Sequence, residues 1–402
     1  MTTLIPASEL EAAEMVRAAM ANGTILSVAG GSTRSCFCDR AAARTVLRST
    51  GLVGIMDYKP QEMVMTVGAG TPVAEVQAAL AEKRQMMAFE PMDPRPVLGT
   101  SGEPTIGGVF AANVSGPRRF VSGAARDSLL GIRFINGRGE AIRAGGRVMK
   151  NVTGLDLVKL LAGSHGTLGF MTEVTFRVLP LPVAIETIVV SSFDDVDAVK
   201  VMSTAMAMPV EVSGAAFLPA SVKERFLGGA LPDSEAVVLR LEGTAASVSA
   251  RADKLVAAME SFGSASRLGM NESQVLWREI RDVHPYADGT QRPLWRISVA
   301  PSVGIQLVAL LRLKADVDAY FDWQGGLIWM RMETDPQAEL LRRHIGTLGG
   351  GHATLMRASD AVAAKTLAFE PLAPRVAALS ERIKMKLDPA GIFSPGKMGG
   401  TV

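Results

Sequence analysis

The sequence has little of what several common functions require. Aromatic residues make up 5% of the 402 residues and the net charge is +2, so we expect neither a base-stacking surface nor a basic field for nucleic acid. No window approaches the ~20 apolar residues of a membrane-spanning helix. The first residues, MTTLIPASELEAAEMV, lack a basic start and an apolar core. We therefore expect no secretory signal.

Cysteine and histidine are also scarce. The two cysteines, Cys36 and Cys38, are one residue apart, and only four histidines are present. This spacing argues against a disulfide between them, and so few ligands predict no metal site. The chain is expected in a reducing, cytoplasmic compartment.

Glycine, in contrast, is abundant. The 40 glycines exceed the average share of ~7%, and the excess lies in the first 180 residues. The richest stretch, 99–139, has few bulky side chains, so its backbone can approach a large flat ligand and offer N–H groups to anionic oxygens. A cluster of surface turns is the alternative interpretation. Neither G-x-G-x-x-G with a later acidic residue nor a P-loop is present, which disfavours a Rossmann site and a P-loop NTPase.

The periodicity predicts an α+β protein with a change of organisation near Pro182. Beyond it the pattern strand, helix, two strands, helix occurs twice, with a helix near 272–283 between the passes and a strand closing the second. Such passes predict an antiparallel sheet with helices on one face. We predict domains at 1–182 and 183–360, followed by a C-terminal helix and tail, 361–402, that return to the first domain.

The first 180 residues resemble the FAD-binding domain of the vanillyl-alcohol oxidase / p-cresol methylhydroxylase (PCMH) superfamily. The resemblance is carried by segments in a fixed order: 29–35 (GG-S/T loop), 105–108 (TIGG), 113–116 (N-x-S-G), 126–127 (RD), 150–154 (KNVTG), 163–169 (G-x-x-G-T-L-G) and 172–173 (TE). It implies a two-part FAD-binding domain of the PCMH type.

Within this superfamily the chain is similar to the FAD-binding subunits of bacterial glycolate oxidase. Segments 293–298, 350–357 and 388–397 carry this similarity. Ser394 stands where asparagine is usual, and His165 replaces a common acidic residue. The similarity implies a heteromeric glycolate dehydrogenase, with a larger homologous FAD subunit and an iron–sulfur subunit as partners. It also implies association with the inner face of the membrane through those partners.

The resemblance implies a set of FAD contacts. The glycine loop at 30–33 would hold the pyrophosphate. Residues of 105–116 would line the other side of the FAD, and 166–169 would lie along its adenine end or its ribityl chain. These residues are Gly30, Gly31, Ser32, Thr33, Thr105, Gly107, Gly108, Ser115, Gly116, Gly166, Thr167 and Gly169. Arg118, Arg119 and Arg126 could meet FAD phosphates or an acidic partner. Covalent attachment in this superfamily uses histidine or cysteine; no histidine precedes His165, so we predict non-covalent FAD.

Oxidation of a 2-hydroxy acid requires a cation for the carboxylate and a base for the hydroxyl. Arg296 and Arg357 are the candidate cations and His352 is the candidate base. A solvated strand arginine and a structural histidine are the respective alternatives. The four tryptophans are expected in the core or at interfaces.

The function predicted is FAD-dependent oxidation of glycolate or D-lactate within a complex that passes electrons to an iron–sulfur partner. Two alternatives stay open. The chain could bind FAD as a scaffold or electron relay beside a catalytic homologue, because it lacks a dense histidine cluster. It could also be a stand-alone oxidase of an aldonolactone or aromatic alcohol.

Overall fold

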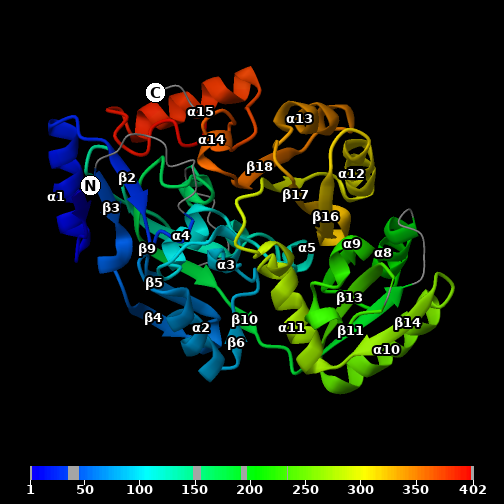
Figure 1. Ribbon diagram of the computed structural model, residues 1–402. Helices are drawn as coiled ribbons and strands as arrows, with labels where there is room; N and C mark the ends of the chain where they lie inside the picture. The colour runs from blue at the N-terminus through cyan, green and yellow to red at the C-terminus, as the bar shows by residue number, and fades with distance from the viewer. Residues whose placement is uncertain (1, 35–44, 148–154, 192–196, 233, 400–402) are drawn as a thin grey trace.

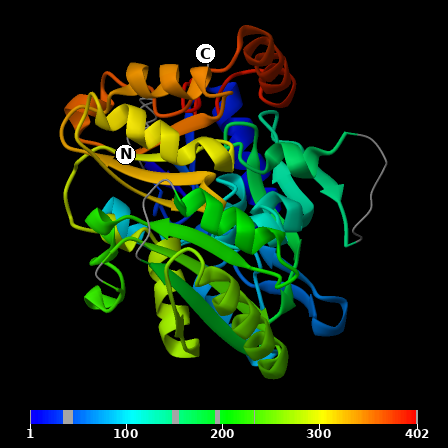
Figure 2. The same ribbon diagram turned by 90° about the vertical axis from the view of Figure 1, so that its right-hand side faces the viewer.

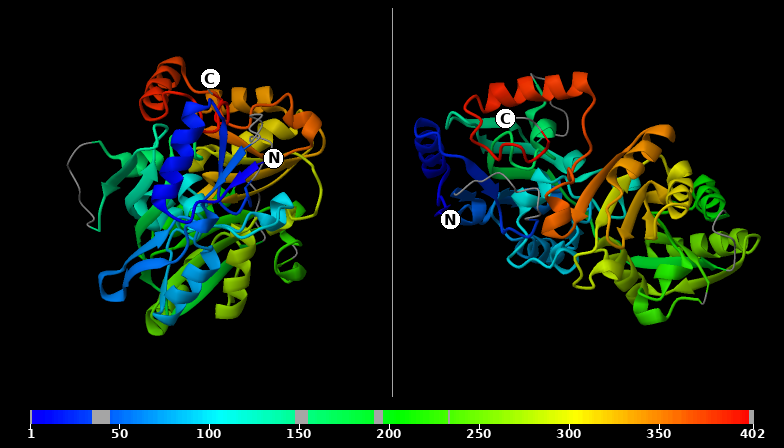
Figure 3. Two further views of the ribbon diagram at one scale, coloured as in Figure 1. Left: turned by 90° about the vertical axis from the view of Figure 1, so that its left-hand side faces the viewer. Right: turned by 45° about the horizontal axis from the view of Figure 1, so that its top comes forward.

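The structure is a computed structural model that describes residues 2–34, 45–147, 155–191, 197–232 and 234–399. It has two lobes (Figures 1 and 3). The strands between residues 2 and 180 form the sheets of the first lobe, and those between 184 and 357 form the sheet of the second. No helix in the described ranges is both long enough and apolar enough to cross a membrane.

The first lobe combines a small parallel sheet with a larger antiparallel one. The parallel sheet has the order β1 (Thr2–Leu4), β3 (Thr45–Arg48), β2 (Leu26–Ala29). The antiparallel sheet has the order β4 (Ile55–Lys59), β5 (Val64–Gly68), β9 (Phe170–Arg177), β7 (Leu129–Ile135), β8 (Ala141–Gly145), and β6 (Gln85–Met86) pairs separately with β10 (Leu179–Pro180). The helices are α1 (Glu9–Ala21), α2 (Val73–Glu82), α3 (Arg95–Leu98), α4 (Ile106–Ala111), α5 (Arg119–Ser122), α6 (Ala125–Ser128) and α7 (Leu157–Leu161).

The second lobe is built on one antiparallel sheet of eight strands. Its order is β14 (Ser264–Leu268), β11 (Ala184–Ser191), β13 (Ala236–Gly243), β12 (Gly214–Leu218), β16 (Val317–Asp322), β17 (Leu327–Met332), β15 (Leu294–Ser298), β18 (His352–Arg357). Read inward from each edge, the two halves have the same order of fourth, first, third and second strand. They meet between β12 and β16, where Phe217 pairs with Phe321 and their rings stack at 5.6 Å. The predicted double pass is therefore present.

Helices cover both faces of this sheet unequally (Figure 2). The helices of the two passes, α8 (Ala198–Ala207), α10 (Ala245–Met259), α12 (Gly304–Arg312) and α13 (Ala338–Thr347), bury their apolar sides in one core. Helix α11 (Met270–Arg281), which lies between the passes, packs on the opposite face through Leu276, Trp277 and Ile280. That second face is the one turned toward the first lobe, since Met92 and Val97 join its core. The α+β class and the helix-covered sheet are confirmed.

The end of the chain lies against the first lobe. After α14 (Asp360–Ala363), helix α15 (Pro374–Leu387) lies beside that lobe (Figure 1). Phe393 is fully buried in the core beneath α1, and the N–H of Leu26 donates to the carbonyl of Ile392 at 2.8 Å. Ser394, which stands where the family usually has asparagine, accepts a hydrogen bond from the N–H of Val28 at 3.2 Å. The tail thus supports β2, whose end leads into the first glycine loop.

A buried charge network joins the lobes. Arg118 of the first lobe contacts Glu90 at 3.0 Å and donates from Nε to Glu242 of the second lobe at 2.8 Å. Arg240 of the second lobe contacts Glu90 at 3.0 Å. Burial alone would raise the pKa of Glu242, but the charges of Arg240 and Arg118 lower it to about 2. Both lobes are therefore needed to balance these charges.

We expect Arg118→Met to destabilise the protein by about 3–5 kcal/mol, because it leaves buried carboxylates without their partner. The matched control is Arg126→Met, since Arg126 is half exposed and lies 3.9 Å from Asp127. Urea unfolding at neutral pH measures both. Because the pKa of Glu242 is depressed in the folded state, the stabilisation is complete above pH ~4.5 and is lost as pH falls toward about 2. Equal loss in both variants would refute the role of the network.

Candidate active site

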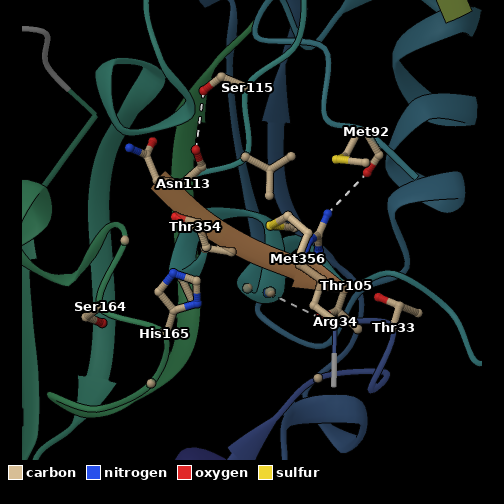
Figure 4. Close-up of a pocket in the computed structure, with 18 of the residues that line it drawn as sticks. Thr33, Arg34, Met92, Thr105, Asn113, Ser115, Ser164, His165, Thr354 and Met356 are labelled. Atoms are coloured by element: carbon tan, nitrogen blue, oxygen red, sulfur yellow. Dashed lines mark hydrogen bonds between the residues drawn. The ribbon is translucent and has the colours of Figure 1, made fainter. Parts of the chain in front are cut away.

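A cavity of about 730 Å³ lies between the two lobes. The first lobe contributes the glycine loop after β2, the α4 segment and residues 163–166; the second lobe contributes β15, β17, β18 and the turn after β16. Side chains from both lobes surround the same space, including His165 from the first and Thr354 and Met356 from β18 (Figure 4). Of the segments that the resemblance singled out, 29–34, 105–108, 113–116 and 163–169 contribute residues to this lining, whereas 126–127 and 172–173 do not.

The first glycine loop passes so close to residues 103–105 that its glycines leave no room for a side chain. A Cβ on Gly30 would collide with the side chain of Thr105, and one on Gly31 with the carbonyl of Glu103. Thr105 is fixed in turn because its hydroxyl accepts the N–H of Gly108 at 3.3 Å at the start of α4. The loop and this segment therefore form two touching walls of the cavity.

The predicted cofactor residues, with one exception, line this cavity. Those that line it are Gly30, Gly31, Ser32, Thr33, Thr105, Gly107, Gly108, Ser115, Gly116, Gly166 and Gly169. Thr167 is not among the lining residues: its hydroxyl donates to the carbonyl of Ser164 at 2.7 Å, and its own carbonyl accepts Lys384 at 2.7 Å. Thr167 therefore links α15 to the first lobe, and its position outside the lining does not support a direct contact with the cofactor.

The cavity carries an excess of positive charge. Among the described residues its lining includes Arg34, Arg48, Arg119, Arg281, Arg296 and Lys397, against the single carboxylate of Asp322. Nε of Arg48 is buried with no hydrogen-bond partner within the described ranges. Arg34 donates to the carbonyl of Met92 at 3.1 Å (Figure 4), and burial lowers its pKa to about 10. Glycine walls, an unsatisfied buried guanidinium donor and surplus cations fit an anionic, extended group such as FAD.

The second lobe presents polar side chains to the cavity from alternate positions of adjacent strands. Arg296 and Ser298 of β15 line it, as do His352 and Thr354 of β18. Arg296 is opposite Thr354 in the strand register, and Ser298 is opposite His352. Because alternate residues of a strand point to one face, the pairing brings the predicted cation and the predicted base to one patch.

His352 and Arg296 influence each other electrostatically. Burial lowers the pKa of His352 below its ordinary 6.5, and the charges of Arg296 and Arg119 lower it further, against a smaller opposing effect of Glu370. His352 lies at the exposed rim of the cavity. Because its pKa is below 6.5, it is mainly neutral at pH 7, the form that accepts a proton. Burial also lowers the pKa of Arg296 to about 10, which leaves it charged.

Arg357 lies outside the cavity, unlike the other two candidates. It is 4% exposed, and its guanidinium donates to the carbonyls of Tyr286, Val97 and Arg292 at 2.6, 2.9 and 3.2 Å. Asp288 is 3.5 Å away. The side chain holds the second lobe to the first, so this placement does not support a direct part in catalysis.

Two residues that the sequence did not single out as site residues complete the lining. Asp322 is 2% exposed and accepts the N–H of Trp323 at 2.7 Å, and burial raises its pKa to about 7. Trp323 has a left-handed backbone with φ of 52° and donates from Nε1 to the carbonyl of Gly116 at 2.9 Å. No sequence signal marks this contact between lobes, although an interface position was expected for the tryptophans.

The predicted attachment of FAD is non-covalent. Cys36, Cys38 and the segment 150–154 lie outside the described residues. His165 lines the cavity, and burial lowers its pKa to about 3. After acid precipitation of purified protein, we expect the flavin colour in the supernatant. A yellow pellet from the wild type that becomes colourless in His165→Ala would contradict this prediction and identify the link.

Comparisons with known proteins agree with this arrangement. The FAD binding domain family matches residues 2–145. The chain is 32% identical to the glycolate oxidase subunit GlcE of Escherichia coli, covering 96% of this chain and 95% of that protein. It is also 31% identical to the glycolate oxidase subunit GlcD of Bacillus subtilis, over 36% of this chain and 29% of that one. Among solved structures, p-cresol methylhydroxylase with substrate bound has the same fold, with a TM-score of 0.72 at 14% identity, covering 99% of this chain and 88% of that one.

Proposed function

The chain belongs to the family of the glycolate oxidase subunit GlcE, and from this premise we propose that it oxidises glycolate or a similar small 2-hydroxy acid with FAD bound between its lobes. One observation carries the proposal. A charged arginine and a neutral histidine, Arg296 and His352, line the cavity that the FAD-binding segments also line. That pair matches the carboxylate and the hydroxyl of the substrate.

FAD supplies the two-electron oxidant that accepts a hydride from the carbon bearing the hydroxyl. Arg296 would bind the substrate carboxylate through its fork of N–H donors. His352 would accept the hydroxyl proton at a ring nitrogen, and the loss of this proton together with the hydride would convert glycolate to glyoxylate. The glycine walls would hold the cofactor, while the surplus cations of the first lobe would balance its pyrophosphate charge.

We further propose that the chain works in a complex with a larger homologous FAD subunit and an iron–sulfur subunit that takes the electrons. The similarity to GlcD over 144 residues supports a homologous partner, and the iron–sulfur subunit rests on the family resemblance. Co-purification of the chain from its own cells, with measurement of flavin, iron and glyoxylate formation, tests this proposal. Purification of the chain from its own cells without either partner would contradict the proposed complex.

A second function is a bound-FAD relay beside a catalytic homologue. It is favoured because few of the candidate catalytic residues face the cavity: Arg357 lies outside it and His352 lies at its rim. The two functions differ in one property. The catalytic subunit reduces its own flavin with glycolate, whereas the relay requires its partner.

The proposed base predicts the pH dependence of the reaction. Because a neutral imidazole is required, kcat/KM should fall as pH drops through the lowered pKa of His352, and should be independent of this group above it. Loss of the Arg296 charge raises that pKa, so the acid limb of Arg296→Gln should move to higher pH. Rates of flavin reduction across a pH series measure both profiles. An unmoved limb in the variant would exclude His352 as the titrating group.

A further inference from the structure

Two arginines from different lobes stack on one indole ring. The guanidinium carbon of Arg119, in α5 of the first lobe, is 4.8 Å from the centroid of the Trp323 ring. That of Arg296, in β15 of the second lobe, is 5.1 Å from the same ring. Trp323 is itself fixed, because it is 8% exposed and its Nε1 donates to Gly116. The two cations are therefore held in one place by contacts that cross between the lobes.

Neither guanidinium has an ion pair within 4 Å in the part of the chain that the structure describes, although the charge of Asp127 acts on Arg119 and that of Asp322 acts on Arg296 from farther away. The described residues include no hydrogen-bond acceptor and no ion-pair partner for the side chain of Arg119 or Arg296, and both line the cavity. Each also lowers the pKa of His352. Two like charges beside one another in a cavity are unfavourable unless an anion joins them. Asp322 compensates only in part, because burial raises its pKa to about 7 and leaves it about half ionised at neutral pH.

The pyrophosphate of FAD is one anion that could join two cations. Its expected place, beside the first glycine loop, is lined by a different pair of cations. Arg34 and Lys397 both act on His165, and they line the cavity with the first glycine loop. Arg119 and Arg296 instead act on His352, the proposed base. The anion beside the base is the carboxylate of the substrate.

We propose that Arg119 is a second substrate-binding residue, and that Arg119 and Arg296 together clamp the single carboxylate of a small 2-hydroxy acid against Trp323. This inference rests on the proposed function. Two planar forks on one carboxylate fix its orientation more tightly than one, so the hydroxyl is directed to His352. Because each lobe supplies one arginine, substrate binding requires the two lobes to be in contact.

The test is calorimetric titration of the FAD-loaded full chain with oxalate, a two-carboxylate analogue of glycolate that has no hydrogen to transfer. We expect Arg119→Met to weaken oxalate binding by about 10-fold or more, as for loss of a desolvated charged partner. Arg138→Met is the matched control, because Arg138 is half exposed and lies outside the cavity lining; it should change the affinity by less than about twofold. The variant Arg119→Met/Arg296→Met should lose less than the product of the two single losses, because both arginines hold one group.

The outcomes separate this inference from the function on which it rests. Oxalate binding that is weakened by Arg296→Met and unchanged by Arg119→Met would overturn the clamp and leave the proposed function intact. Failure of the wild type to bind oxalate or to be reduced by glycolate would overturn both. Where Arg119→Met loses FAD or unfolds, Arg119→Lys replaces it. Lysine keeps the charge but lacks the planar fork, so binding as tight as the wild type would then refute the clamp.

Discussion

Arg296→Met is expected to lower kcat/KM for glycolate by at least about 30-fold, equivalent to ~2 kcal/mol, while FAD content stays unchanged. The variant removes a cation that lines the cavity and has no ion pair among the described residues. Its loss therefore affects the substrate anion; within the fold it removes the stacking on Trp323 but breaks no ion pair of the described residues. Arg296→Lys should be intermediate, since an ammonium group cannot bind a carboxylate through two parallel N–H groups.

Steady-state rates with an artificial electron acceptor measure this effect. Arg292→Met is the matched control, because Arg292 lies just before β15 and is half exposed beside Glu333 at 2.9 Å. It should retain wild-type kcat/KM. Equal activity of Arg296→Met and Arg292→Met would exclude Arg296 from substrate binding.

Gly31→Ala is expected to weaken FAD binding by roughly 5- to 150-fold, the equivalent of ~1–3 kcal/mol of overpacking. The new methyl group would meet the backbone carbonyl of Glu103, which cannot move aside as a flexible side chain can. The first loop and the segment before α4 must then separate, and both line the cavity. The expected result is purified protein with little bound flavin, measured by the ratio of flavin to protein absorbance and by titration with FAD.

Gly346→Ala is the matched control for this change. Gly346 is an exposed residue of α13, and a Cβ there meets no atom within 4 Å. Alanine should stabilise the helix by about 0.5–1 kcal/mol and leave FAD binding unchanged. If Gly31→Ala binds FAD as tightly as Gly346→Ala does, the loop is not a wall of the cofactor site.

Much of the fold follows from periodicity in the sequence. The double pass in the second lobe was predicted because its strands are apolar and its helices amphipathic, as in β13 and α10. Strand β14 was missed. Its sequence, SASRL, is mostly polar because it is an edge strand with exposed residues, so nothing in its composition distinguishes it from a loop.

The site was predicted less evenly. Arg296 and His352 line the cavity, but Arg357 does not. The spacing of His352 and Arg357 in the sequence would have predicted this difference. His352 and Arg357 are five residues apart on one strand, and alternation directs such positions to opposite faces. From the sequence, Arg119 was only one of several arginines that could meet FAD phosphates or an acidic partner, and Asp322 had no role. Their positions depend on a contact with a turn about 200 residues away for Arg119 and on burial for Asp322.

The most direct test of the account is anaerobic mixing of the purified, FAD-loaded chain with glycolate while the flavin absorbance is recorded. The account predicts that the flavin bleaches without any partner protein, and that deuterium on the oxidised carbon slows the bleaching. The same mixing with Arg296→Met should show slow bleaching at wild-type flavin content. Flavin that stays oxidised until a homologous subunit is added would contradict the catalytic assignment and favour the relay.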